Sequence, residues 1–404
     1  MSELTLDLVH QVREACADPR YARLKKLWTR HNRLEKVEKV PLGIHLHRGY
    51  TRTWREIIPP DVLVSQEPLE RFVELQLRQK LFRHHNIPDD DVLLPTIWLD
   101  PVRPAGADRL WGVPLERLDS DDPAGAYTFR GALQDEADLA KLHYPRYEVA
   151  EPATGQMVER ARELVDDLLP VKLWNDELHP TPAEHLVKFL GWENYLLYFI
   201  EKPAFVHKVM DFLTEGFLAY QHDREAKGAV DAESTWAFRV RYEELPPEEP
   251  PNRLSSCWLY VAAQTTGTIS PKMFAEFVHP YNERVVGLFG KQRIYYHGCE
   301  DLTPKLDIIA TLPGLRRFDV GPWTDLAACV EKFGRSVVLE VQVHPGRTIL
   351  SADPAEMRKD IRRILDTARD GIFDVNLSDV ETVNGDPAIL TTWAQIAQEV
   401  AAGG

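Results

Sequence analysis

The chain has 404 residues, 44% of them hydrophobic, and its 63 acidic and 48 basic residues leave a formal net charge of -15. Ten Trp, 15 Phe and 13 Tyr can fill a sizeable core, which excludes a disordered chain, and the acidic balance argues against nucleic acid as a partner. The first twenty residues are charged throughout and no run approaches about 18 apolar residues, so we expect neither a signal peptide nor a membrane span. The four scattered cysteines cannot form a disulfide framework and predict a cytoplasmic protein.

The first part of the chain predicts helices separated by loops. Residues 1–40 predict two helices and form the N-terminal extension of our predicted domain division, in which 41–404 is the second unit. The segment PLGIHLHRGY (41–50) predicts a strand with His45 and His47 on one face. Apolar spacing predicts helices at 67–83 and 203–226. Composition rich in Pro, Gly and Asp predicts loops or short strands at 101–130, and the prolines of 244–252 predict a loop.

From residue 254 onward, short strands alternate with helices. The predicted strands are 258–261, 293–297, 316–320, 337–343 and 372–376. The predicted helices are 271–289, 302–311, 324–333, 354–369 and 387–400. Ser270 and Asp353 each precede a proline and predict N-caps for two of these helices. Such alternation predicts a parallel sheet, either open or closed into a barrel.

Polar residues gather where the predicted strands end. They are His297 and Cys299, then Asp319, then Gln342 and His344, and then Asn376, Ser378 and Asp379. In a (β/α)8 barrel these ends converge on one face, where catalytic residues lie. Four successive strands with this pattern favour a barrel over an open sheet. We therefore predict an α/β fold, a single (β/α)8 TIM barrel with an N-terminal helical extension.

The motif His297-Gly298-Cys299-Glu300 is the sharpest local feature. An imidazole and a thiolate two residues apart offer a mixed donor set that suits Zn²⁺. The alternative for the same pair is a packed cysteine beside a hydrogen-bonded histidine. Other strand ends would have to supply the remaining ligands, and Asp319, Glu340 and His344 are the candidates.

Several stretches resemble the uroporphyrinogen decarboxylase superfamily, which also contains zinc-dependent methyltransferases that work with corrinoid proteins or thiols. The matching stretches are ISPKMFAEFVHPYNERVV (269–286), IYYHGCEDL (294–302), LRRFDVGPWTDL (315–326), VQVHPGRTIL (341–350) and the helical region 192–220. The C-terminal DVETVNGDPAILTTWAQIAQEV resembles a long, roughly 400-residue branch of this superfamily. The resemblance covers nearly all of the chain after residue 130, and it is more specific for the fold than for the reaction.

The methyltransferase branch binds zinc through an H-x-C pair and a later Cys, and the zinc activates a thiol. His297 and Cys299 match the pair, but the chain has Asn376-Leu377-Ser378-Asp379-Val380 where the later Cys is expected. Asp319 occupies a place comparable to an acidic ligand of related methionine synthases. The resemblance thus implies a metal site of His297, Cys299 and Asp319 with an open fourth position.

Two other enzyme classes make different demands on the same residues. The metal-free decarboxylase branch would use Asp100 and Arg48, together with His297, on a small acid. An amidohydrolase-like zinc hydrolase would use His45 and His47 on the first strand, with His297 and Asp379. A barrel without the third zinc ligand is also compatible with a non-catalytic, ligand-binding protein.

The best-supported function at this stage is a methyl or small-group transferase. The candidate catalytic residues are Glu300, Asp100 and His344, and the candidate substrate-binding residues are Arg48, His45, His47 and Trp323. The expected cofactor is Zn²⁺, and any corrinoid would arrive on a partner protein, because the chain has no recognisable corrinoid-binding module. The expected partners are a small-molecule substrate, a corrinoid protein and a second copy of the chain as a homodimer.

Overall fold

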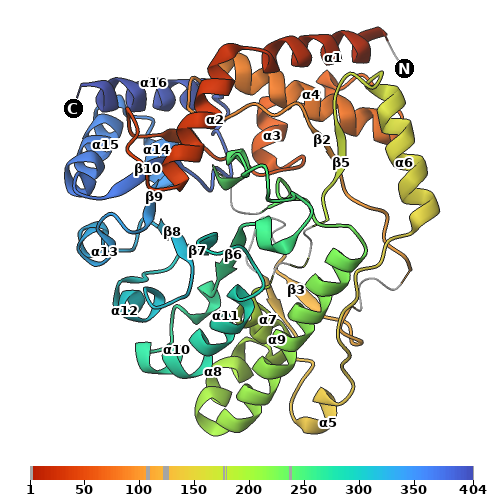
Figure 1. Ribbon diagram of the computed structural model, residues 1–404, viewed down its shortest axis with the longest axis vertical. Helices are drawn as coiled ribbons and strands as arrows, with labels where there is room; N and C mark the ends of the chain where they lie inside the picture. The colour runs from red at the N-terminus through yellow and green to blue at the C-terminus, as the bar shows by residue number, and fades with distance from the viewer. Residues whose placement is uncertain are drawn as a thin grey trace.

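The computed structural model describes the whole chain except residues 1–2, 106–109, 122–126, 176–177, 179, 236–238 and 404. Its centre is a six-stranded parallel sheet in the order β1-β10-β9-β8-β7-β6 (Figure 1). These strands are β1 (Leu42–Ile44), β6 (Leu259–Ala262), β7 (Ile294–His297), β8 (Leu315–Val320), β9 (Val338–Val343) and β10 (Ile372–Leu377). A second parallel pair joins β2 (Ile97–Leu99) to β5 (Val171–Leu173).

These eight strands follow the order of a (β/α)8 barrel, as the sequence predicts. The sheet is not a closed cylinder, because the described residues show no backbone ladder between β1 and β2 or between β5 and β6. Helices cover the outside of the six-stranded sheet (Figure 1). They are α10 (Pro271–Phe277), α11 (His279–Val286), α12 (Leu306–Ile309), α13 (Leu326–Phe333), α14 (Pro345–Ser351), α15 (Pro354–Ala368) and α16 (Ala388–Ala402). The strands' outward side chains, such as Phe318 and Leu339, join the main apolar core with these helices.

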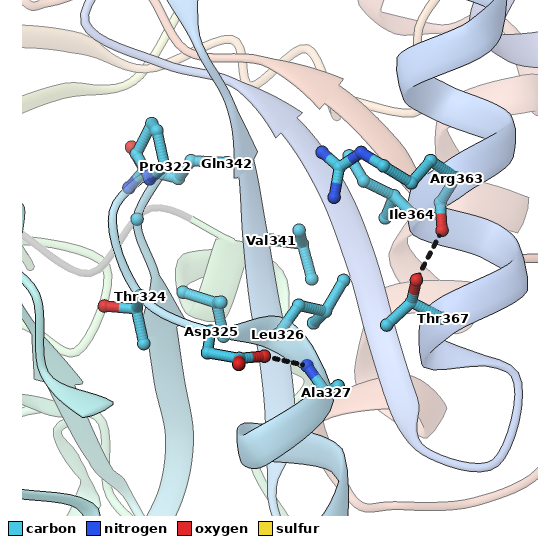
Figure 2. A pocket seen from close by; sticks show the side chains of 12 residues that line it. Pro322, Thr324, Asp325, Leu326, Ala327, Val341, Gln342, Arg363, Ile364 and Thr367 are labelled. Atoms are coloured by element: carbon cyan, nitrogen blue, oxygen red, sulfur yellow. Dashed lines mark hydrogen bonds between the residues drawn. The ribbon is translucent and has the colours of Figure 1, made fainter. Parts of the chain in front are cut away.

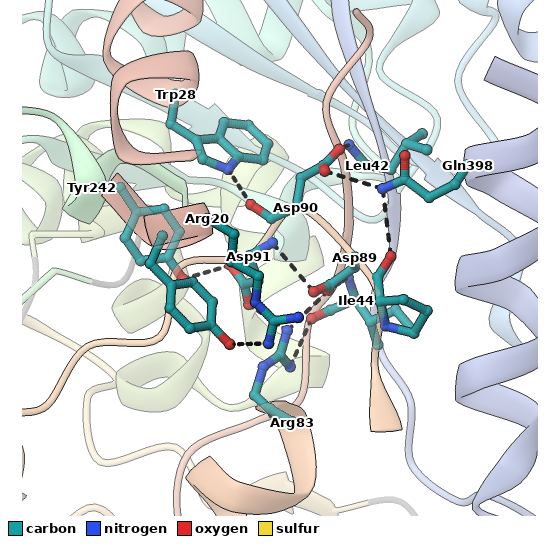
Figure 3. A network of polar contacts seen from close by, with 12 residues as sticks. Arg20, Trp28, Leu42, Ile44, Arg83, Asp89, Asp90, Asp91, Tyr242 and Gln398 are labelled. Atoms are coloured by element: carbon teal, nitrogen blue, oxygen red, sulfur yellow. Dashed lines mark hydrogen bonds and ion pairs between the residues drawn. The ribbon is translucent and has the colours of Figure 1, made fainter. Parts of the chain in front are cut away.

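Side chains bond the backbone of β1 on the side that faces β2. Asp90 Oδ2 accepts a hydrogen bond from the Leu42 N–H at 3.0 Å, and Asp89 Oδ2 accepts one from the Ile44 N–H at 2.8 Å (Figure 3). Arg83 donates to the Ile44 carbonyl at 3.1 Å and to Asp89 at 2.9 Å. Because these groups satisfy the polar backbone of β1, the barrel can stay open beside β2 without leaving buried groups unbonded.

The N-terminal region packs as a second helical layer. The predicted pair of helices is present as α1 (Glu3–Cys16) and α2 (Pro19–Asn32), and α1 lies beside α4 (Pro68–Asn86) (Figure 1). Buried Val9 and Val12 of α1 share an apolar cluster with Val73 and Leu77 of α4. The division of the chain at residue 40 stays a prediction.

The end of α2 reaches the base of the barrel. Arg317 is fully buried and donates to Asn32 at 2.8 Å, to Glu340 at 2.5 Å and to Asp374 at 2.9 Å. His31 Nε2 lies 2.9 Å from Asp374 Oδ2. The barrel interior is therefore held at this level by a buried polar network and not by apolar packing.

The remaining elements connect the strands. They are α3 (Arg52–Ile57), the antiparallel pair β3 (Arg117–Asp119) and β4 (Tyr127–Phe129), α5 (Glu136–Leu139), α6 (Glu151–Leu164), α7 (Pro182–Leu190), α8 (Trp192–Glu201) and α9 (Pro203–Ala226). None of the described helices combines the length and apolar character needed to cross a membrane.

Some predicted bounds were wrong. The helix predicted at 271–289 is broken at Val278 into α10 and α11, because Pro280 lacks the N–H that a continuous helix needs. The strand predicted at 41–50 is only β1, and 302–311 holds a 3₁₀ turn followed by the four-residue α12. Helix 203–226 and the N-caps Ser270 and Asp353 are confirmed.

Candidate functional site

A cavity of about 440 Å³ lies at the carboxyl ends of the barrel strands. Both strand groups contribute to it, which shows that the eight strands surround one site. Its walls include His45 and His47 after β1, Trp98 of β2, Trp174 after β5, Tyr260 of β6, His297 of β7, Cys299, Gln342 of β9, and Ser378 and Asp379 after β10. This is the face where barrel enzymes carry their chemistry.

His297 is held in one orientation by Asp319. The Asp319 Oδ2 atom lies 2.9 Å from His297 Nδ1, and Asp319 is fully buried. A carboxylate only accepts hydrogen bonds, so Nδ1 carries a proton and Nε2 faces the other way. Gln342 donates to Asp319 Oδ1 at 2.7 Å and fixes the carboxylate in turn. Carboxylates in this position orient metal-binding histidines in many proteins.

His297 Nε2 points to Cys299. The Nε2 and Sγ atoms are 3.3 Å apart. A Cβ at Gly298, between them, would lie 2.8 Å from both Glu300 Oε2 and Leu302 Cδ1, so a larger residue there would require these two side chains to move. In the described part of the chain, one group of three residues brings potential ligand atoms within 4.8 Å of one another. It consists of His297, Cys299 and Asp319. The structure thus brings together the three residues of the predicted metal site.

Asp379 also lies beside Cys299. Its Oδ2 atom is 3.9 Å from Cys299 Sγ, and its Oδ1 atom is 3.8 Å from His47 Nε2. The Asp379 backbone is left-handed, with φ of 53°, which costs an ordinary residue free energy and is concentrated at functional sites. The segment after β10 therefore supplies a carboxylate where the family pattern predicts a cysteine.

A buried chain of polar groups continues from His297 to the base of the barrel. The Tyr295 hydroxyl oxygen lies 3.1 Å from His297 Nδ1, and the same hydroxyl donates to Glu340 Oε1 at 3.1 Å. Glu340 then accepts from Arg317. Burial opposes a charge on His297, but interactions with Tyr260 and Asp319 and a hydrogen bond to Cys299 raise its pKa well above the ordinary value. Burial also raises the pKa of Glu340.

Other residues proposed from the sequence lie away from this centre. Glu300 does not line the cavity, and neither carboxylate oxygen has a hydrogen-bond partner, so burial raises its pKa. His344 caps α14 and contacts the exposed ring of Trp323, with centroids 5.4 Å apart. Neither His344 nor Trp323 lines the cavity. The catalytic and binding roles of these residues stay predictions.

Arg48 lines the cavity and forms a salt bridge with Asp100, which does not line it. His45 and His47 both line it, with ring centroids 5.0 Å apart. The described residues place neither histidine in the group of three potential ligands.

Sequence reasoning missed the aromatic walls of the cavity. Tyr260 stacks on His297 with ring centroids 5.0 Å apart, and Trp98 meets Trp174 edge to face at 5.4 Å. Tyr260 lies two residues before Ala262, which pairs with His297 across the sheet, so strand periodicity could have placed it on the inner face. For Trp174 no comparable signal exists, because β5 has only three residues.

A second hollow of about 330 Å³ lies outside the barrel, between β8, β9 and the helices α13 and α15 (Figure 2). Its carboxylate, Asp325, caps α13 by accepting from the Ala327 N–H at 2.8 Å. Its lining residues include no cysteine or histidine, so the barrel cavity is the candidate site.

Comparisons with known proteins agree with this geometry. Residues 256–377, which contain β6 to β10, match the family model of uroporphyrinogen decarboxylase (URO-D). The structure is similar to that of a methyltransferase from Methanosarcina mazei, with a TM-score of 0.56 and 15% identity, over 93% of this chain and 98% of that one. None of the curated proteins compared with the chain matches it. At this identity the structural likeness shows the fold, and the family model covers the strands that carry His297, Cys299 and Asp319. Residues 256–377 are therefore similar to the uroporphyrinogen decarboxylase family, and the chain as a whole shares the fold of the methyltransferase.

Proposed function

We propose that this protein is a zinc-dependent transferase of a methyl or similar small group, acting on a thiol or a corrinoid-linked substrate. The observation that carries the proposal is the pairing of His297 Nε2 with Cys299 Sγ at 3.3 Å in the wall of the barrel cavity. A nitrogen and a sulfur donor at this spacing are typical of zinc sites. The methyltransferase that shares this fold supports the same class of reaction, whereas the matching family model is that of a decarboxylase.

The donor set fits a zinc ion in its chemistry. His297 and Cys299 would hold the ion, and Asp319 keeps Nε2 of His297 directed toward it. Asp379 lies beside Cys299 but outside the described group of three potential ligands. Zinc bound there would lower the pKa of a substrate thiol, and the thiolate is the nucleophilic form.

The surroundings of His297 determine how its proton is held. Asp319 and the Tyr295 oxygen both lie within 3.1 Å of Nδ1, so the proton on that nitrogen has two acceptors. This arrangement leaves the lone pair of neutral His297 on Nε2, on the side of Cys299. The histidine is therefore pre-organised to bind an electrophile on one nitrogen only.

A zinc hydrolase is the second candidate, because His45, His47 and Asp379 line the same cavity. Unlike the transferase, a zinc hydrolase would not require Cys299. The metal-free decarboxylase is less well supported, because Asp100 lies outside the cavity wall.

A corrinoid protein and a second copy of the chain remain predicted partners. A cytoplasmic location remains a prediction too. None of the four cysteines forms a disulfide, which is consistent with a reducing compartment.

The direct test is methyl transfer from free methylcobalamin to homocysteine or ethanethiol, followed by the absorbance of the corrinoid. The thiolate sulfur forms a bond to the methyl carbon, the cobalt–carbon bond breaks, and its electron pair stays on cobalt. We expect thiol-dependent transfer that falls at least about a hundredfold in Cys299→Ser and in His297→Ala, and that persists in Cys16→Ser. Transfer at the wild-type rate in both site variants would contradict the proposal.

A further inference from the structure

The cavity is larger than a methyl group and a thiol require. Its volume of about 440 Å³ is in the range of pockets that hold drug-sized ligands. It runs from His297 and Cys299 to the opening between β1 and β2, where Phe72 and Leu75 of α4 form part of its wall. This extension, here called the lateral arm, exists because residues 89–91 bond β1 on that side and no ladder joins β1 to β2.

The arm is lined by aromatic faces. Trp98 of β2 and Trp174, directly after β5, are both 7% exposed and form an edge-to-face pair. Tyr242 lines the same cavity, and Tyr260 connects this wall to His297 through their stacked rings. A planar aromatic ligand gains both apolar burial and favourable ring geometry against such a wall.

The cationic side chain of Arg48 lies beside this wall. The Arg48 guanidinium lies 5.0 Å from the ring centroid of Trp174 and lines the cavity. Its carboxylate partner, Asp100, has a side chain 61% exposed to solvent, so the pair is well screened and contributes little to stability. A ligand carboxylate that replaced Asp100 on Arg48 would form a charged hydrogen bond with the same guanidinium. The other cations of the arm bind groups of the protein. Arg83 donates to Asp89 and Asp91, and Lys80 donates to the Leu94 carbonyl.

We infer that the substrate is an aromatic carboxylate, whose ring lies against Trp98 and Trp174 in the lateral arm and whose acid group binds Arg48. The inference rests on the proposed function only for the part of the substrate that reacts near Cys299. Recognition of the ring and the acid group requires neither zinc nor a methyl acceptor, so it can be tested separately.

The test is isothermal titration calorimetry with three probes. 2-Naphthoate has the ring and the charge, cyclohexanecarboxylate has the charge alone, and 2-naphthalenemethanol has the ring alone. We expect 2-naphthoate to bind at least about tenfold more tightly than either of the others. Equal binding of 2-naphthoate and cyclohexanecarboxylate would overturn the inference.

Two variants locate the bound probe. Arg48→Gln should weaken the binding of 2-naphthoate by about tenfold and leave the binding of 2-naphthalenemethanol unchanged. Arg52→Gln is its matched control. Trp174→Leu should weaken both aromatic probes, whereas Trp192→Leu on the exposed face of α8 should weaken neither. Unchanged 2-naphthoate affinity in Arg48→Gln would contradict the assigned position of the acid group.

Repeating the titration on protein dialysed against a chelator separates this inference from the proposed function. Retained 2-naphthoate affinity supports a site that is independent of zinc. Loss of that affinity would show that the carboxylate binds the metal and would overturn the role of Arg48. Failure of methyl transfer alone would leave the binding result intact.

Discussion

At the residue scale, the site depends on the buried carboxylate of Asp319, which orients His297. Asp319 is fully buried, accepts from His297 and Gln342, and so determines which nitrogen of His297 faces Cys299. The sequence identified His297, Cys299 and Asp319 because each stands at a strand end. It could not show that Asp379 lies within 3.9 Å of Cys299, since 80 residues separate the two and only the folded chain brings them together.

Asp319→Asn should lower zinc affinity without removing a zinc-contacting donor atom. The amide keeps the shape of the side chain but loses the charge that favours the Nδ1 proton. We expect an affinity about 10- to 100-fold lower in competition with a chromogenic chelator. Asp370→Asn, an exposed change after α15, serves as the control. Equal affinities of Asp319→Asn and the wild type would show that Asp319 does not orient His297.

At the element scale, the opening beside β1 is an arrangement that periodicity does not predict. The alternating pattern predicted the strands β6 to β10 to within one or two residues, because each is an apolar run flanked by helix caps. The opening instead depends on side-chain bonds from residues 89–91, which in sequence resemble an ordinary acidic loop. Helix α14 was also missed, because its seven residues are too few to show helical periodicity.

Asp90→Ala should destabilise the protein through this element. The change leaves the buried Leu42 N–H without its carboxylate acceptor and removes a partner of Lys39. We expect the free energy of unfolding in urea to fall by about 1–3 kcal/mol, the cost of a buried unsatisfied donor. Asp370→Ala should change it by less than about 0.5 kcal/mol. A loss for Asp90→Ala no larger than that for Asp370→Ala would mean that the backbone of β1 finds other partners.

At the scale of the whole molecule, the N-terminal helices and the barrel are joined through buried charges. Asp319, Glu340 and Asp374 are register neighbours on three adjacent strands, and fully buried Arg317 binds two of them. His31 and Asn32 from α2 complete this network. The sequence predicted the helices of residues 1–40 but not this role, because polar residues at a helix end are normally solvated.

This junction makes stability depend on pH. Burial lowers the pKa of His31, partly offset by its hydrogen bond to Asp374, so the unfolded chain binds a proton more readily than the folded one. With respect to His31, the folded state has its full stability above the unfolded pKa of about 6.5, and it loses stability as the pH falls below that value. Between pH 6.5 and 5.5 the free energy of unfolding should fall by up to about 1.4 kcal/mol from this group.

Urea denaturation at several pH values measures this effect. His31→Gln should flatten the dependence between pH 6.5 and 5.5, because glutamine does not titrate, whereas His10→Gln on the exposed side of α1 should leave it unchanged. Identical pH profiles for His31→Gln and the wild type would contradict a neutral, buried His31.

The most direct measurement of the central claim is the zinc content of protein purified without added metal and without a His tag. We expect about one zinc per chain in the wild type and in Cys16→Ser, and far less in Cys299→Ser and His297→Ala. Absence of zinc from the wild type, or full retention in both site variants, would contradict a metal site built on His297 and Cys299.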